Sequence, residues 1–196
     1  MDNRFESART EAFSDGVFAI AITLLVLEIS VPKSEFHDLW RGIANQWPSY
    51  LSYITSFMTI GGLWLVHHAI FRRLVNADTV VIRLNLLLLM AVSFLPFPTK
   101  LMAEALHQHA GERQAVLFYG AVLFVITSLI TAMARYAARE HLVEDNVTRE
   151  ELQALVNRTA PSAGFFGGVT LLAFFAPTVA VFGFLVVAVQ AILRTR

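Results

Sequence analysis

The chain has 196 residues, of which 56% are hydrophobic and only 15% are charged, with a formal net charge of zero. A soluble domain of this length carries about a quarter charged residues, so the composition indicates an integral membrane protein, and the balanced charge gives no reason to expect a nucleic acid as a partner. The sequence has no cysteine, which excludes disulfides, thiolate metal sites and cysteine nucleophiles.

The first apolar run is short. Its 12 uncharged residues, Gly16–Leu27, lie between Asp15 and Glu28, and they cover roughly 18 Å of a hydrocarbon core about 30 Å thick. To span the membrane, the helix must extend from about Thr10 to Val31, with the two acidic residues near the membrane edges or facing a wet interior. Pro32 then ends it. The run lacks a small-residue cleavage site, so we interpret it as a retained helix.

Three further runs are expected to cross the membrane. Residues 51–71 and 114–134 each provide 21 uncharged residues, and residues 84–99 provide 16 between Arg83 and Lys100. The run of 16 is expected to gain a turn at each end. Pro96 and Pro98 should kink or break its last turn, because proline inside a helix removes a hydrogen bond and clashes with the preceding turn.

The last apolar run covers residues 159–193, which are 35 residues without a charge. As one helix it would reach roughly 52 Å, too long for a single crossing. Two short helices with a turn near Ala176 and Pro177 fit better. The sequence therefore predicts an all-α integral membrane bundle of six transmembrane helices, with residues 1–196 forming a single domain.

The basic residues predict the orientation of this bundle. With a cytoplasmic N-terminus, the inner segments hold 11 arginines, and the outer segments hold only Lys33, Arg41, Lys100 and Arg113. Cytoplasmic loops are enriched in Lys and Arg, so we expect both termini in the cytoplasm and a multi-pass protein of the cell membrane. The polar connections 33–48, outside, and 139–158, inside, are interpreted as short interfacial helices.

A polar cluster opens the first helix. Arg9 and Asp15 are six residues apart, so they lie on different faces and are expected to bond to neighbouring helices. Polar groups at this depth usually face the bundle interior and find partners there. The candidate partners are Trp64, His67 and His68 on the second helix and Asn85 on the third. A structural hydrogen-bond network is the favoured interpretation, and direct contact with an ion is the alternative.

Ile20, Leu24 and Leu27 share one face of the first helix, with Thr23 on the flank of the same stripe. Periodicity alone favours contact with lipid or with the core for such a stripe. A threonine at this position usually bonds back to its own helix.

The string Arg9-x-x-x-Phe13-Ser14-Asp15, followed by Gly16-Val17-Phe18-Ala19-Ile20-Ala21-Ile22-Thr23, resembles the signature of the transmembrane protein 175 family of potassium channels. The strings at residues 62–68 and 96–99 are similar to the family as well. The resemblance covers the whole chain as one six-helix unit, which implies the prokaryotic branch, a homotetramer with the four first helices around a central pore.

The resemblance also implies roles for single residues. Ile20, Leu24 and Leu27 would be the rings of aliphatic side chains that narrow the pore, and Thr23 a hydroxyl ring that helps to discriminate potassium. The motif residues would form the network that fixes the pore helix near its cytoplasmic end; these are Arg9, Phe13, Ser14 and Asp15.

The mechanism must differ from that of a carbonyl-cage filter, because no Thr-Val-Gly-Tyr-Gly-type segment occurs. A narrow aliphatic ring supplies no oxygen to an ion and gates by dewetting. Our hypothesis is that Ile20 forms the tightest gate and that partial dehydration past the other rings gives a modest preference for potassium. Glu28 either attracts cations to the outer mouth or is a solvated charge.

Other classes are less well supported by the residues. His67 and His68 are adjacent and point about 100° apart, and His107 and His109 have no obvious further ligands nearby, so we expect no metal and no cofactor. A secondary transporter is the alternative function, although paired interrupted helices are lacking. No serine–histidine, paired-aspartate or His-Glu-x-x-His arrangement suggests an intramembrane enzyme. Only the motif argues against the interpretation that the chain is a purely structural membrane protein.

Overall fold

The computed structural model describes residues 5–140, 142–143 and 164–194. Four of its helical segments are long and apolar enough to cross a membrane, namely Ser7–Glu28, Trp47–Phe71, Thr79–Gln108 and Glu112–Arg139. A shorter apolar helix covers Pro177–Gln190. The prediction of an all-helical membrane protein is therefore confirmed.

The helices in chain order are α1 (Ser7–Leu24), α2 (Leu39–Asn45), α3 (Trp47–Phe71), α4 (Thr79–Phe94), α5 (Pro96–Gln108), α6 (Glu112–Arg139) and α8 (Pro177–Arg194). Residues 164–172 are also helical and precede α8. Two 3-10 helices, η1 (Leu25–Glu28) and η2 (Lys33–Asp38), follow α1 and precede α2. The strands β1 (Phe5–Glu6) and β2 (Asn76–Ala77) pair antiparallel.

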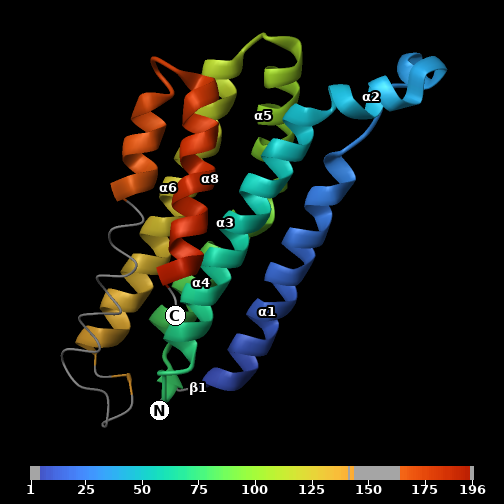
Figure 1. Cartoon of the computed structure of the whole chain (residues 1–196). Coiled ribbons are helices and arrows are strands. Elements are labelled where there is room, and N and C mark those ends of the chain that lie inside the picture. The colour runs from blue at the N-terminus through green and yellow to red at the C-terminus, as the bar shows by residue number, and fades with distance from the viewer. Residues whose placement is uncertain (1–4, 141, 144–163, 195–196) are drawn as a thin grey trace.

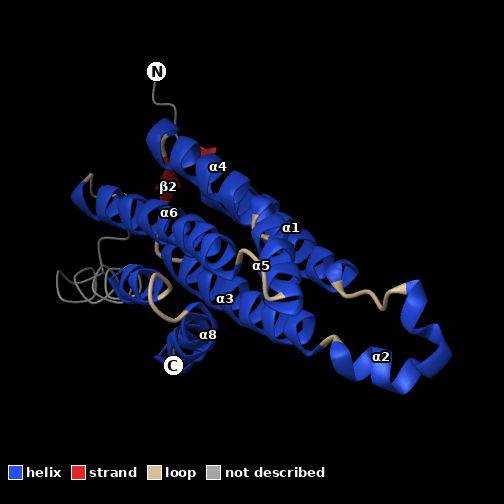
Figure 2. Ribbon diagram, turned by 90° about the horizontal axis from the view of Figure 1, so that it is seen from above, coloured by secondary structure: helices blue, strands red, loops and turns tan. Residues whose placement is uncertain are grey.

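Helix α3 runs through the bundle and contacts α1, α5 and α8 (Figures 1 and 2). Helix α1 packs against α3 and α4, and α4 packs against α6. The pairing of β1 with β2 ties the start of α1 to the connection between α3 and α4, and Ser7 Oγ donates to the Leu74 carbonyl at 3.1 Å. Helix α1 is therefore anchored at its first turn and lies at the edge of the bundle.

The interior is packed with large apolar side chains. Phe18, Phe71, Tyr119 and Phe184 are all fully buried. Residues 164–172 approach α6 closely at Gly120, where a Cβ atom would lie less than 3.0 Å from the Thr170 side chain. Small residues at such crossings let helix backbones come close together. The van der Waals contacts that result help to hold membrane helices to one another.

The first helix ends earlier than predicted. Its last regular turn is the 3-10 helix η1, which ends at Glu28, and Ile29 is already extended with φ −88° and ψ 112°. The expected end near Val31 was wrong, because the last turn narrows to a 3-10 helix, which rarely runs for more than three or four residues, and the extended backbone begins two residues before Val31. The connection from α1 to α3 then forms the short helices η2 and α2, and α2 projects sideways from the bundle (Figure 1).

The third apolar segment is longer than predicted. The prolines break it at Leu95, as expected, but α5 then continues for 13 residues to Gln108. Proline is favourable in the first turn of a helix, where its missing N–H has no partner to lose, so Pro96 starts a new helix here. Lys100 does not end the segment, because it lies inside α5.

The turn predicted near Ala176 is confirmed, because residues 173–175 form a turn and α8 begins at Pro177. The inner connection predicted at residues 139–158 lies largely outside the described residues.

Candidate functional site

The exposed face of α1 carries the predicted stripe. Ile20, Leu24 and Leu27 are 60%, 41% and 71% exposed. Thr23 is exposed as well, and its hydroxyl donates to the Ile20 carbonyl at 2.9 Å. All four side chains therefore point away from the other helices of their own chain. A large apolar surface on a helix that packs through its other face needs a partner or lipid.

The opposite face of α1 is buried. Ser14, Phe18, Ala21 and Leu25 on it are at most 1% exposed and face α3 and α4, the two helices that α1 contacts. Their spacing of three and four residues is that of one helix face. This packing fixes the rotation of α1 about its own axis, and with it the direction of the exposed stripe.

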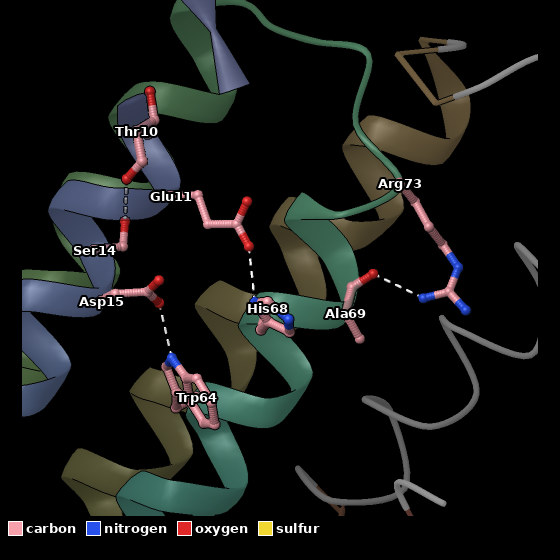
Figure 3. Close-up of polar contacts among 8 residues, drawn as sticks. All are labelled: Thr10, Glu11, Ser14, Asp15, Trp64, His68, Ala69 and Arg73. Carbon is pink, nitrogen blue, oxygen red and sulfur yellow. Dashed lines mark hydrogen bonds and ion pairs between the residues drawn. The ribbon is translucent and has the colours of Figure 1, made fainter. Parts of the chain in front are cut away.

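Two polar contacts join the first part of α1 to α3 (Figure 3). The Trp64 indole Nε1 donates to Asp15 Oδ1 at 2.8 Å. One turn further along α3, His68 Nδ1 lies 2.8 Å from Glu11 Oε1, and the two α3 rings stack with centroids 5.5 Å apart. Asp15 and Glu11 are four residues apart on α1, so they are matched to two α3 residues with the same spacing.

A second chain of hydrogen bonds joins α1 to α3 through α4. Asn85 Nδ2 donates to Ser14 Oγ at 2.9 Å, and Ser14 Oγ donates to the Thr10 carbonyl at 2.8 Å. The Asn85 amide oxygen accepts from His67 Nε2 at 2.9 Å. Since an amide oxygen can only accept, this chain assigns the His67 proton to Nε2. Every bond then runs in one direction, from His67 to the backbone of α1.

The ring of His67 is held between aromatic side chains. The centroids of Phe71 and Phe18 lie 4.4 Å and 5.3 Å from the histidine centroid. His67 and Asn85 are 0% and 1% exposed. The site is closed to bulk solvent by the described part of the chain, which suits a fixed structural clamp better than an ion pathway.

Two of the motif residues lie outside this network. Arg9 is exposed, and no hydrogen bond or ion pair of it occurs among the described residues. Phe13 is 58% exposed, on the same side of α1 as Ile20. Their implied place in the network is therefore not reflected in contacts within one chain.

Sequence reasoning missed a third polar cluster, in the middle of the bundle. Ser56 Oγ lies 2.8 Å from Thr99 Oγ1 and 3.0 Å from the Tyr119 hydroxyl, which links α3, α5 and α6. All three side chains are buried. The available signal was the row of hydroxyl residues on α3 at positions 52, 56 and 59, which share one face of an otherwise apolar helix.

Sequence reasoning also missed the partner of Glu28. Its Oε2 lies 3.1 Å from Lys100 Nζ, with the two side chains 27% and 49% exposed. The ion pair joins η1, at the C-terminal end of α1, to α5. Among the described residues no group of three or more His, Asp or Glu side chains is placed to hold a metal ion.

Comparisons with known proteins agree on one family. Residues 9–96 match the family described as "Endosomal/lysosomal potassium channel TMEM175". A potassium channel of Chamaesiphon minutus is 38% identical over 195 residues, covering 97% of this chain and 96% of that one. The endosomal/lysosomal proton channel TMEM175 of Gallus gallus is 36% identical over 157 residues, 68% of this chain and 31% of the longer relative.

The fold has been seen in a crystal. The structure described as a lysosomal potassium-selective channel TMEM175 homolog from Chamaesiphon minutus superposes with a TM-score of 0.88 at 37% identity, covering 97% of this chain and 98% of that one.

Proposed function

The chain belongs to the TMEM175 family, and from this premise we propose that it is a passive potassium channel of the cell membrane, assembled from four copies with α1 of each lining the pore. Its relatives are ion channels and not enzymes. The observation that carries the proposal is the exposed stripe of Ile20, Leu24 and Leu27 on a helix whose other face is locked to α3 and α4.

Lipid is the other possible neighbour of this stripe, and the polar residues of α1 argue against it. Thr23 lies within the stripe, and Gly16 lies on the same side with open space in front of it. Asp15 and Glu11 point away from the stripe, to Trp64 and His68 on α3. Small and hydroxyl side chains are typical of surfaces where membrane helices meet other protein chains, which favours neighbouring copies of α1 over lipid.

In the proposed pore, the aliphatic side chains form successive rings with no oxygen to replace the hydration shell of an ion. Ile20 forms the tightest ring and gates by dewetting. The Thr23 proton is engaged by the Ile20 carbonyl, so its lone pairs are the free part of the hydroxyl and supply acceptors to a passing ion. A modest preference for potassium follows, because potassium gives up water more easily than sodium.

The proposal includes six membrane crossings and two cytoplasmic termini. Residues 164–172 and α8 would form the last pair of short crossings. In support, α8 runs toward the end of the bundle at which α1 begins (Figure 1), which is the direction that an even number of crossings requires.

The test is ion flux from liposomes that contain the purified full-length protein. We expect rapid, non-saturating potassium efflux, slower sodium efflux and little flux of a larger organic cation. Saturable uptake coupled to protons or sodium would instead establish a secondary transporter. Because animal relatives are named proton channels, a pH-sensitive dye belongs in the same assay. No flux of any ion at any voltage or pH would overturn the proposal.

A further inference from the structure

The outer end of α1 carries one acidic residue, and its charge is matched within the chain. Glu28 closes η1, one residue after Leu27, which is 71% exposed. Its carboxylate meets Lys100 Nζ at 3.1 Å. Lys100 lies in the first turns of α5, just after the proline break, so the break in the third segment places this cation beside η1.

We propose that Lys100 sets the electrostatic potential at the outer mouth of the pore by neutralising Glu28, so that the mouth carries four ion pairs in place of a ring of four carboxylates. The inference rests on the proposed arrangement of four α1 helices around the pore. It makes Lys100 a residue that determines conductance without touching the permeating ion.

The charges are exposed enough for this role. The Glu28 side chain is 27% exposed and the Lys100 side chain is 49% exposed. Both groups are therefore in contact with solvent, where a single ion pair adds little to folding stability. The electrostatic potentials of the four copies of each group add at the pore axis. At about 10 Å in water, four unpaired carboxylates would raise the local potassium concentration roughly sevenfold at 10 mM salt, and hardly at all at 1 M, where the Debye length is about 3 Å.

Glu104 allows a matched control. It lies four residues after Lys100 on α5, is exposed, and lines a groove between α5 and α6 with Gln108 and Phe118, and it acts on Lys100 more weakly than Glu28 does. Its removal changes the net charge by as much as the removal of Glu28 does. A general effect of surface charge on conductance would therefore appear in both Glu28→Gln and Glu104→Gln. An effect of the charge at the pore mouth would appear only in Glu28→Gln.

The experiment measures single-channel potassium conductance of the reconstituted full-length protein at 10 mM and 1 M KCl. We expect Lys100→Gln to raise the conductance about two- to fivefold at 10 mM, and Glu28→Gln to lower it by a similar factor, because an unpaired ring of lysines repels cations. The double variant and Glu104→Gln should remain near the unmodified protein. All differences should vanish at 1 M.

Equal conductance of Lys100→Gln and Glu28→Gln at 10 mM would overturn the inference, as would differences that persist at 1 M KCl. Persistent differences of the same sign in both variants would show that the ion pair acts as a mechanical brace for η1. If either Lys100→Gln or Glu28→Gln does not assemble, the other variant still tests the inference, because the expected changes in conductance have opposite signs. Absence of flux in the unmodified protein would refute the proposed function instead.

Discussion

The indole of Trp64 donates a hydrogen bond to the carboxylate of Asp15 over 2.8 Å, and this bond ties the second membrane helix to the first. It lies in the first half of α1 and is opposite in direction to the exposed stripe. Together with the buried bond between Asn85 and Ser14 at 2.9 Å, it holds α1 from two neighbouring helices at nearly the same level. A helix held in this way cannot rotate without breaking both bonds.

Trp64→Phe tests the first of these bonds. The variant keeps the aromatic ring and removes the donor, which leaves the partly buried Asp15 carboxylate without its partner. Loss of one partner of a buried charged group costs about 1–3 kcal/mol. We expect a lower midpoint of thermal unfolding in detergent and a reduced potassium flux. Trp47→Phe, at a site 48% exposed on the same helix, is the control and should change neither quantity.

Asn85→Ala tests the second bond and should be the more damaging substitution. It removes both the donor to Ser14 and the acceptor for His67, in a site where all three side chains are at most 1% exposed. Two buried partners left unsatisfied cost about 2–4 kcal/mol. On the same helix, Ser93→Ala removes only a hydroxyl that bonds to its own helix. Equal unfolding midpoints for the two variants would contradict a clamp at Asn85.

Much of the fold could be predicted from the lengths of the runs of uncharged residues, because an unpaired charge in hydrocarbon is costly. The second, fourth and last runs were located in this way. The same reasoning brought out Trp64 and Asn85 as possible partners of α1, since polar residues inside a membrane segment need a partner in the bundle. The structure does place them within hydrogen-bond distance of Asp15 and Ser14.

The rest depended on contacts between distant residues. Counting charges treats Lys100 as the end of a run, but a lysine with an acidic partner such as Glu28 can lie inside a longer helix. In the same way, Ser56 looks like an ordinary small residue until α5 and α6 bring Thr99 and Tyr119 to it. The row of hydroxyl residues on α3 indicates a polar face, but local sequence does not identify the partners in either pairing, because each joins residues more than 40 positions apart.

Gly120 should tolerate no side chain. In Gly120→Ala, the new methyl group would lie less than 3.0 Å from the Thr170 side chain, so residues 164–172 must move away from α6. Such overpacking costs about 1–3 kcal/mol. We expect a lower unfolding midpoint, partly restored by adding Thr170→Ala. Gly61→Ala is the control, because its Cβ would meet open space. A stable Gly120→Ala protein would show that this crossing is not tight.

Ile20 is the gate of the proposed pore. If Ile20 forms a dewetting ring in the proposed pore, Ile20→Asn should raise potassium conductance severalfold, because four amide groups keep water in the constriction. Selectivity over sodium should fall at the same time, since a wetter ring no longer forces partial dehydration. Flux from liposomes at equal protein density measures both quantities.

Val26→Asn provides the matched control for this gate. Val26 is 50% exposed in η1, the 3-10 continuation of the same helix, where three residues per turn place it about 120° from its neighbour Leu27 in the stripe. The same polar group is therefore introduced on the same helix outside the stripe. We expect it to leave conductance near that of the unmodified channel. An unchanged conductance in Ile20→Asn, or an equal increase in both variants, would exclude Ile20 as the gate and assign the constriction to Leu24 or Leu27.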